Sequence, residues 1–359
     1  RSIASTGEYN ASPGLPLYRG EHIMRLLMFH GRLTYRLRSI LLFLLTTISV
    51  TVRRWRRGPR LSTWTWAFET ATTFLQRQER VAFDLPTLAE QREYTDALVF
   101  RSPAYSRVRI EAIQEAAVKG RWFVPQTVLS QQTILYFHGG GYAFSALAHD
   151  DLIALVALAA QARTFALDYR LAPEYPFPAQ LEDAQAAYQW LLNRGIPHER
   201  LVIAGDSAGG NLVLALLLAL RDARQPLPAL AICLCPWTDM GTSSESLSSN
   251  EPYDWIERCM VIQWGQWFCQ GADLHNPLIS PVHADLRGLP PMYIQAGDAE
   301  LLIDMIRAFA QKAQEQGAAV SLEVWEQMNH DFQFYGSALR QSREALQRIG
   351  EVIQQVIAT

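Results

Sequence analysis

The sequence predicts an α/β fold, in which a mostly parallel central sheet carries helices on both faces. Two observations lead to this class. From Gln132 onward, apolar segments of four to seven residues alternate with segments of helical length. Such short apolar runs between helices are typical of parallel strands that are buried on both faces. The chain also has 359 residues, of which 49% are hydrophobic, and this is enough to bury one large core.

The alternation gives each element in turn. The expected strands are 133–138, 163–169, 201–205, 229–235, 291–295 and 320–325. The expected helices are 152–162, 179–193, 207–223, 301–316 and 339–357. An earlier pair of segments, near 97–100 and 108–116, is expected to supply antiparallel strands at one edge of the sheet.

The segment between 239 and 291 interrupts this rhythm. It is first rich in serine, over 242–250, and then aromatic and helical in pattern over 254–270. An insertion after a central strand lies above the carboxyl ends of the strands, where ligands bind in open α/β sheets. We therefore expect it to form a cap together with the N-terminal region, although plain packing of its aromatic side chains on the core is the alternative.

These patterns divide the chain into four parts. They are a flexible segment 1–18, cap or lid helices 19–90, a main α/β domain of 91–240 and 280–359, and a cap insertion 241–279.

Composition excludes some classes of protein. The net charge of −3 argues against a nucleic-acid-binding protein. Cys233 and Cys235 lie on an apolar strand candidate and are expected to be small core residues. No cluster of His or Cys with zinc-ligand spacing accompanies them, so no metal is predicted. Four cysteines without a disulfide pattern favour a reducing compartment and a cytoplasmic location.

The N-terminal region is basic and contains an apolar run. Residues 39–52 are uncharged, and arginines lie on both sides of them. Fourteen residues form a helix of about 21 Å, which is short against a hydrocarbon core of about 30 Å. Two interpretations remain: a lid helix that packs on the protein, or an amphipathic segment, residues 36–57, that contacts an anionic membrane surface.

The glycine-rich segment 205–210 (GDSAGG) follows an apolar strand candidate and precedes an apolar helix. A serine at the apex of such a strand–turn–helix is typical of a nucleophile elbow, in which flanking glycines permit a sharp turn. Ser207 is therefore the predicted nucleophile. A serine hydroxyl needs a base to remove its proton, so a histidine, an acid and an oxyanion hole are expected elsewhere.

A second glycine-rich segment, 138–142 (HGGGY), follows the strand candidate 133–138. Bare backbone N–H groups in such a loop can stabilise the oxyanion of an acyl-transfer intermediate. By itself the segment could be an ordinary turn, but its position before the elbow favours the catalytic interpretation. The backbone N–H of Ala208, next to the nucleophile, is expected to be a further donor.

The base is predicted to be His330, because it follows the last strand candidate and precedes the final helix. The acid should follow the preceding strand, 291–295. Asp298, Glu300 and Asp304 are all available there, and Asp304 falls within a predicted helix. The residues alone do not choose between Asp298 and Glu300, since either carboxylate can orient the imidazole.

Together these segments resemble the bacterial hormone-sensitive-lipase-like esterases of the α/β-hydrolase fold. The resemblance runs from about 133 to 334 through six motifs: HGGGY (138–142), DYRLAPE (168–174), GDSAGGN (205–211), CPWTD (235–239), PLISP (277–281) and NHDF (329–332). It implies an α/β-hydrolase fold with a helical cap, no cofactor, and oxyanion donors on Gly140, Gly141 and Ala208. It also implies Glu300 as the acid, thirty residues before His330, with Asp298 as the runner-up and with glutamate where aspartate is common.

The predicted protein is a serine carboxylesterase that acts through an acyl-enzyme on short- to medium-chain acyl esters. Tyr142, Phe144 and Trp237 are expected to line its pocket. The predicted partners are a small-molecule ester, a membrane surface and a second copy of the chain, but no nucleic acid. An amidase or lactonase with the same triad, or a non-catalytic small-molecule receptor, is the alternative.

Overall fold

The fold is described from a computed structural model, which covers residues 26–115, 118–241 and 243–355. The predicted flexible segment 1–18 lies outside these described residues. Within them, the helices are α1 (Leu33–Arg57), α2 (Trp66–Phe83), α3 (Leu88–Thr95), α4 (Leu147–Ala160), α5 (Ala179–Asn193), α6 (Ala208–Asp222), α7 (Ser246–Ser249), α8 (Arg258–Cys269), α9 (Ile303–Glu315) and α10 (Arg340–Gln355).

The strands of the described residues are β1 (Leu26–Phe29), β2 (Leu98–Arg101), β3 (Val108–Glu115), β4 (Val118–Pro125), β5 (Thr133–Phe137), β6 (Arg163–Leu167), β7 (Leu201–Asp206), β8 (Leu230–Leu234), β9 (Met292–Gly297) and β10 (Val320–Trp325). Eight of them form the central sheet, in the order β10-β9-β8-β7-β5-β6-β4-β3. Strands β5 to β10 are parallel, and β3 and β4 add an antiparallel edge. The predicted α/β-hydrolase fold with a mostly parallel sheet is confirmed.

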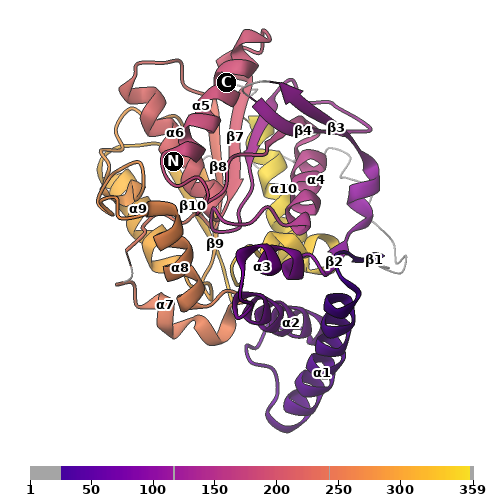
Figure 1. Cartoon of the computed structure of the whole chain (residues 1–359). Helices are drawn as coiled ribbons and strands as arrows, with labels where there is room; N and C mark the ends of the chain where they lie inside the picture. The colour runs from indigo at the N-terminus through magenta and orange to yellow at the C-terminus, as the bar shows by residue number, and fades with distance from the viewer. Residues whose placement is uncertain (1–25, 116–117, 242, 356–359) are drawn as a thin grey trace, which may run out of the picture.

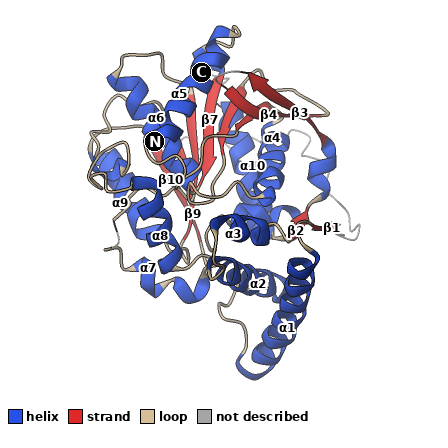
Figure 2. Cartoon of the chain, viewed as in Figure 1, coloured by secondary structure: helices blue, strands red, loops and turns tan. Residues whose placement is uncertain are grey.

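Side chains alternate along the strands between two cores, because successive residues of a strand point to opposite faces of the sheet. Leu135 and Ile203 face the core that helices α5, α6 and α9 cover. Ile134 and Val202 face the opposite core, which α4 and α10 cover. Figure 2 shows helices on both sides of the strands. Burial on both faces explains why these strands are continuous apolar runs in the sequence.

The parallel direction of β5 to β10 brings the loops that follow them to one edge of the sheet. These loops carry the glycine-rich segment 138–142 after β5, Ser207 after β7, Glu300 after β9 and His330 after β10. The topology thus gathers residues that are far apart in the sequence.

The prediction for the antiparallel edge was partly wrong. The segment 108–116 does form an edge strand, β3, but its partner is β4, which sequence analysis did not identify. The segment near 97–100 forms β2, which pairs instead with β1 in a separate two-stranded sheet. Strand β4 contains Lys119 and Arg121 between its apolar residues, and Gly120 interrupts the pattern that would have marked it.

Helices α1, α2 and α3 lie together at one end of the molecule, with α7 and α8 of the insertion beside them (Figure 1). The predicted helix over 254–270 is shorter than expected, since α8 begins only at Arg258. Among the described residues, one helix, α1, is long and apolar enough to cross a membrane by length and composition. The division into catalytic domain and cap stays a prediction.

Candidate active site

Ser207 occupies the turn between β7 and α6 and has an unusual backbone conformation. Its φ is 53° and its ψ is −119°, a region that non-glycine residues rarely adopt. The neighbouring chain must come very close, because a Cβ at Gly209 would lie 2.0 Å from the carbonyl oxygen of Phe137. The predicted elbow therefore needs glycine at this position for a steric reason.

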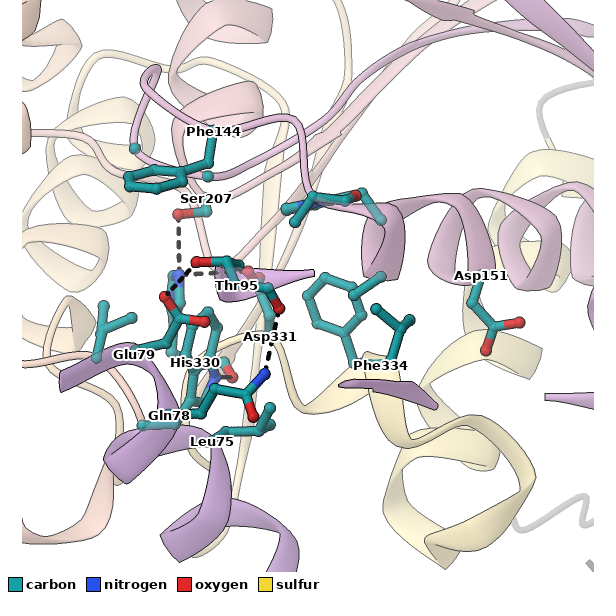
Figure 3. A pocket seen from close by; sticks show the side chains of 18 of the residues that line it. Leu75, Gln78, Glu79, Thr95, Phe144, Asp151, Ser207, His330, Asp331 and Phe334 are labelled. Atoms are coloured by element: carbon teal, nitrogen blue, oxygen red, sulfur yellow. Dashed lines mark hydrogen bonds and ion pairs between the residues drawn. The ribbon is translucent and has the colours of Figure 1, made fainter. Parts of the chain in front are cut away.

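His330 lies in the loop after β10, with one ring nitrogen directed at the serine. Its Nε2 is 2.9 Å from Oγ of Ser207, as the dashed line in Figure 3 marks. Both residues are buried. The loop is held by the cap insertion: Asp254 accepts the backbone N–H of His330 at 3.2 Å, and the indole N–H of Trp255 donates to its carbonyl oxygen at 2.7 Å.

Of the three candidate acids, the structure brings Glu300 to the other side of the imidazole. Oε1 of Glu300 is 4.0 Å from Nδ1 of His330, and Oε2 accepts the backbone N–H of Gly297 at 3.0 Å. Asp298 instead accepts the backbone N–H of Gln327. Asp304 accepts the backbone N–H of Ser246 in the cap insertion at 2.8 Å. Each of these two carboxylates thus has a structural hydrogen bond.

The 4.0 Å separation between Glu300 and His330 is longer than a hydrogen bond. Both facing atoms are buried, and neither has a hydrogen-bond partner among the described residues. Buried polar atoms without partners are costly, so a small movement that joins these two is favoured. Hydrogen bonds between catalytic groups are often long before substrate binds.

The charges around His330 favour its protonated form. Burial alone would lower the pKa of His330, but the negative charges of Asp331 and Glu300 outweigh it and raise the pKa from 6.5 to about 10. Asp331 lies on the same side as the serine, with Oδ2 3.3 Å from Nε2. Burial also raises the pKa of Asp331, which keeps its charge only beside a protonated histidine.

The loop after β5 lines the same cavity as the serine, through Gly140 and Gly141. Gly140 and Gly141 have φ values of 92° and 60°, which glycine adopts without strain. None of the hydrogen bonds within the described residues uses the N–H of Gly140, Gly141 or Ala208. The N–H of Gly139, by contrast, donates to Asp206 at 2.9 Å. The N–H groups of Gly140, Gly141 and Ala208 are thus open, and their role as oxyanion donors stays a prediction.

A cavity of about 130 Å³ opens beside these groups. Its lining includes Ser207, His330, Gly140, Gly141, Phe144 and Trp264, together with Leu75, Gln78 and Glu79 from α2 (Figure 3). Of the three predicted pocket residues, only Phe144 is among the described residues that line it. Tyr142 stacks on Phe268 and donates to Asn211 at 2.6 Å, so the prediction for Tyr142 was wrong.

Trp237 is also buried, and it is not among the described residues that line the cavity. Its backbone N–H donates to the carbonyl oxygen of Ser207 at 3.1 Å, and its own carbonyl oxygen accepts the side-chain amide of Asn211 at 2.6 Å. Trp237 therefore helps to hold the elbow. The sequence shows only an aromatic residue near the site, so this structural role could not be predicted from it.

Three acidic residues near the site were not identified from sequence. Asp206 joins the elbow to the glycine loop, since it accepts both the N–H of Gly139 and the hydroxyl of Tyr136. Asp254 bridges the insertion to the loops of Glu300 and His330. Asp206 and Asp331 are adjacent in sequence to Ser207 and His330, and this position is a signal from which they could have been predicted as site residues. No local sequence pattern identifies Asp254 as a site residue.

Cys235, Glu300 and His330 offer three potential metal-ligand atoms within 4.8 Å of one another. Metals bind the thiolate form of cysteine, whereas burial raises the pKa of Cys235 well above its ordinary value. His330 is moreover directed at Ser207 by one nitrogen and at Glu300 by the other. The contacts of His330 therefore fit a general base better than a metal ligand.

Comparison with known proteins shows that this chain is similar to ester hydrolases. A family model described as the alpha/beta hydrolase fold matches residues 134–334. An acetyl-hydrolase of Streptomyces hygroscopicus is 41% identical over 225 residues, which are 62% of this chain and 75% of that protein. An esterase of Acinetobacter venetianus is 32% identical over 263 residues, which are 72% of this chain and 86% of that protein.

Solved structures agree with these relatives. The crystal structure of EstE5 soaked with p-nitrophenyl butyrate is 33% identical, with a TM-score of 0.72 over 79% of this chain and 99% of that one. An esterase from the bacterial hormone-sensitive lipase family is 35% identical, with a TM-score of 0.71 over 79% of this chain and 97% of that one.

Proposed function

Because this chain belongs to the bacterial hormone-sensitive-lipase-like esterases of the α/β-hydrolase fold, and so is a serine ester hydrolase, we propose that it cleaves carboxylic esters through Ser207, His330 and Glu300. The observation that carries this assignment is the 2.9 Å contact between Nε2 of His330 and Oγ of Ser207. The unpartnered Nδ1 of His330, which faces Oε1 of Glu300, supports the role of Glu300 as the acid.

In the acylation step, His330 accepts the hydroxyl proton of Ser207 at Nε2 while Oγ attacks the ester carbonyl carbon. The carbonyl oxygen becomes an oxyanion, which the N–H groups of Gly140, Gly141 and Ala208 stabilise. His330 then gives its proton to the departing alkoxide, and an acyl-enzyme remains on Ser207. Glu300 holds the imidazole in the correct tautomer and stabilises its charged form.

In the deacylation step, a water molecule replaces the alcohol. His330 accepts a proton from this water, the resulting hydroxide attacks the acyl carbon, and the same three N–H groups stabilise the second oxyanion. The C–O bond to Ser207 then breaks, and His330 returns the proton to Oγ. The acid product leaves and the free enzyme is restored.

The cavity bears on the length of the acyl chain. A volume of about 130 Å³ holds a small acyl group, and its lining is mainly apolar. We propose short- to medium-chain acyl esters as substrates. Cleavage of amides or lactones would use the same catalytic groups, so an amidase or lactonase stays the alternative. Hydrolysis of matched acyl anilides and lactones would test it.

Two further properties belong to the proposal. Residues 36–57, the greater part of α1, contact a membrane surface peripherally, as the exposed apolar side chains of this helix suggest. A cytoplasmic location stays a prediction that cell fractionation can test. A homodimer stays a prediction that light scattering can test.

The experiment for the mechanism is hydrolysis of p-nitrophenyl acetate and butyrate by the wild type and by Ser207→Ala. Loss of the nucleophile should lower kcat by about 10⁴-fold or more, because the acyl-enzyme can no longer form. Circular dichroism checks that the variant is folded. Turnover retained by a folded Ser207→Ala would refute the mechanism.

A further inference from the structure

Helix α1 carries a continuous apolar stripe on the surface of the molecule. Its large apolar residues are exposed at eight positions: Leu33, Leu37, Leu41, Leu44, Leu45, Ile48, Val52 and Trp55. At about 100° per residue, these positions fall within an arc of about 120°. Apart from Thr34 and Thr51, no polar residue shares that arc. A contiguous apolar surface of this kind marks a site of interaction rather than scattered exposure.

The opposite side of α1 is joined to the protein by polar contacts. Thr46 accepts a hydrogen bond from Arg77 at 3.1 Å. At the edge of the stripe, Thr51 accepts one from the indole N–H of Trp66 at 2.9 Å. Near its end, Arg54 pairs with the fully buried Glu69 at 2.6 Å. These bonds would be lost if the helix crossed a bilayer, so α1 is suited to lie along a surface.

The charges of α1 complement an anionic surface. The helix contains six arginines and no acidic residue. Arg38 and Arg56 border the apolar stripe, at about 20° beyond its edge on the helical projection. Arg56 and Arg57 are exposed, and within the described residues no carboxylate lies at ion-pair distance from either. Trp55, which is 84% exposed, adds an aromatic side chain of the type that favours membrane interfaces.

We propose that α1 lies in the plane of an anionic phospholipid surface, with the apolar stripe among the acyl chains and the arginines at the headgroups. The inference rests on the membrane contact proposed above and names its partner, but it does not depend on the chemistry at Ser207. Helix α2 packs against α1 and also lines the cavity, so the lipid-bound surface adjoins the pocket wall. Figure 1 shows α1 on the outer side of α2.

The test is co-sedimentation of the full chain with sucrose-loaded vesicles of phosphatidylcholine, alone or mixed with phosphatidylglycerol. The wild type should pellet with the mixed vesicles and far less with the neutral ones, and added salt should weaken binding. The triple variant Leu41→Glu, Leu44→Glu, Ile48→Glu should bind mixed vesicles at least about tenfold more weakly.

A matched control carries three glutamates elsewhere on the surface, at Val128, Leu129 and Leu274, which are exposed apolar residues outside α1. This control should pellet almost as the wild type does. A second variant, Arg56→Gln with Arg57→Gln, should lose the preference for anionic vesicles while it keeps weak binding to neutral ones.

Two readouts separate this inference from the esterase mechanism. The triple α1 variant should hydrolyse soluble p-nitrophenyl acetate at the wild-type rate, and Ser207→Ala should pellet as the wild type does. Wild-type protein that stays in the supernatant, or a triple variant that pellets fully, would overturn the inference. So would a dimer that the triple variant dissociates without any vesicle binding, since a second copy would then cover the stripe.

Discussion

The geometry of the site depends on the backbone conformation of Ser207 and on the buried position of the His330 imidazole. The serine accepts a backbone conformation that few non-glycine residues adopt, and Gly209 makes it possible by leaving room for the chain at Phe137. The imidazole between Ser207 and Glu300 is buried, so each of its contacts acts in a medium of low polarity, where electrostatic interactions are strong.

The acid can be assigned by comparing two amide variants. Glu300→Gln should lower kcat/KM by about 10³-fold or more, because an amide can neither fix the required tautomer nor stabilise the imidazolium. Asp298→Asn should change it by less than about tenfold, since Asp298 accepts a backbone hydrogen bond from Gln327, which an asparagine oxygen can also accept. Steady-state hydrolysis of p-nitrophenyl acetate measures both, and a larger loss in Asp298→Asn would reverse the assignment.

The pH dependence should report on Asp331. His330 must be neutral to accept a proton, and its pKa is raised, so activity is lost as the pH falls through a value above the ordinary 6.5. Asp331→Asn removes a negative charge 3.3 Å from Nε2 and should move this acidic limb to lower pH. Profiles of kcat/KM against pH for the two proteins test this. An unchanged or higher midpoint in the variant would contradict the role of Asp331.

At the scale of elements, the order of most strands and helices along the chain could be predicted because each is a short apolar run or a helical pattern. Strand β4 could not, since Gly120 and its charged neighbours break that pattern and only the pairing with β3 and β6 defines it. The same limit applies to the site. Ser207 and His330 follow from their positions after strands, whereas Asp254 acts through contacts between distant loops that no local pattern encodes.

The attachment of α1 to α2 depends on the buried carboxylate of Glu69, which pairs with Arg53 and Arg54. Glu69→Ala should lower the free energy of unfolding by about 3 kcal/mol, because the partly buried guanidinium groups of Arg53 and Arg54 lose the carboxylate that neutralises them. Chemical denaturation followed by tryptophan fluorescence measures the change. Glu93→Ala, which removes an exposed pair with Arg32, is the matched control and should have little effect. Equal losses in the two variants would contradict this account of the anchor.

At the scale of the whole molecule, loops that follow the strands of the sheet meet helices α2 and α8 around a cavity. Phe144 and Trp264 face it from the loop after β5 and from α8, and α2 closes it on another side. The limited volume predicts that kcat/KM falls as the acyl chain is lengthened from butyryl to dodecanoyl. A series of p-nitrophenyl esters tests this, and a rate that rises steadily with chain length would show that the pocket is larger or opens.

The proposed mechanism requires an acyl-enzyme on Ser207. Rapid mixing of enzyme with excess p-nitrophenyl acetate, followed by an acid quench and mass spectrometry of the peptides, detects this intermediate. We predict a burst of nitrophenolate of about one equivalent when deacylation is the slower step, and an acetyl group on Ser207 that is absent from Ser207→Ala. Acetylation at another residue, or steady turnover by Ser207→Ala, would contradict the account.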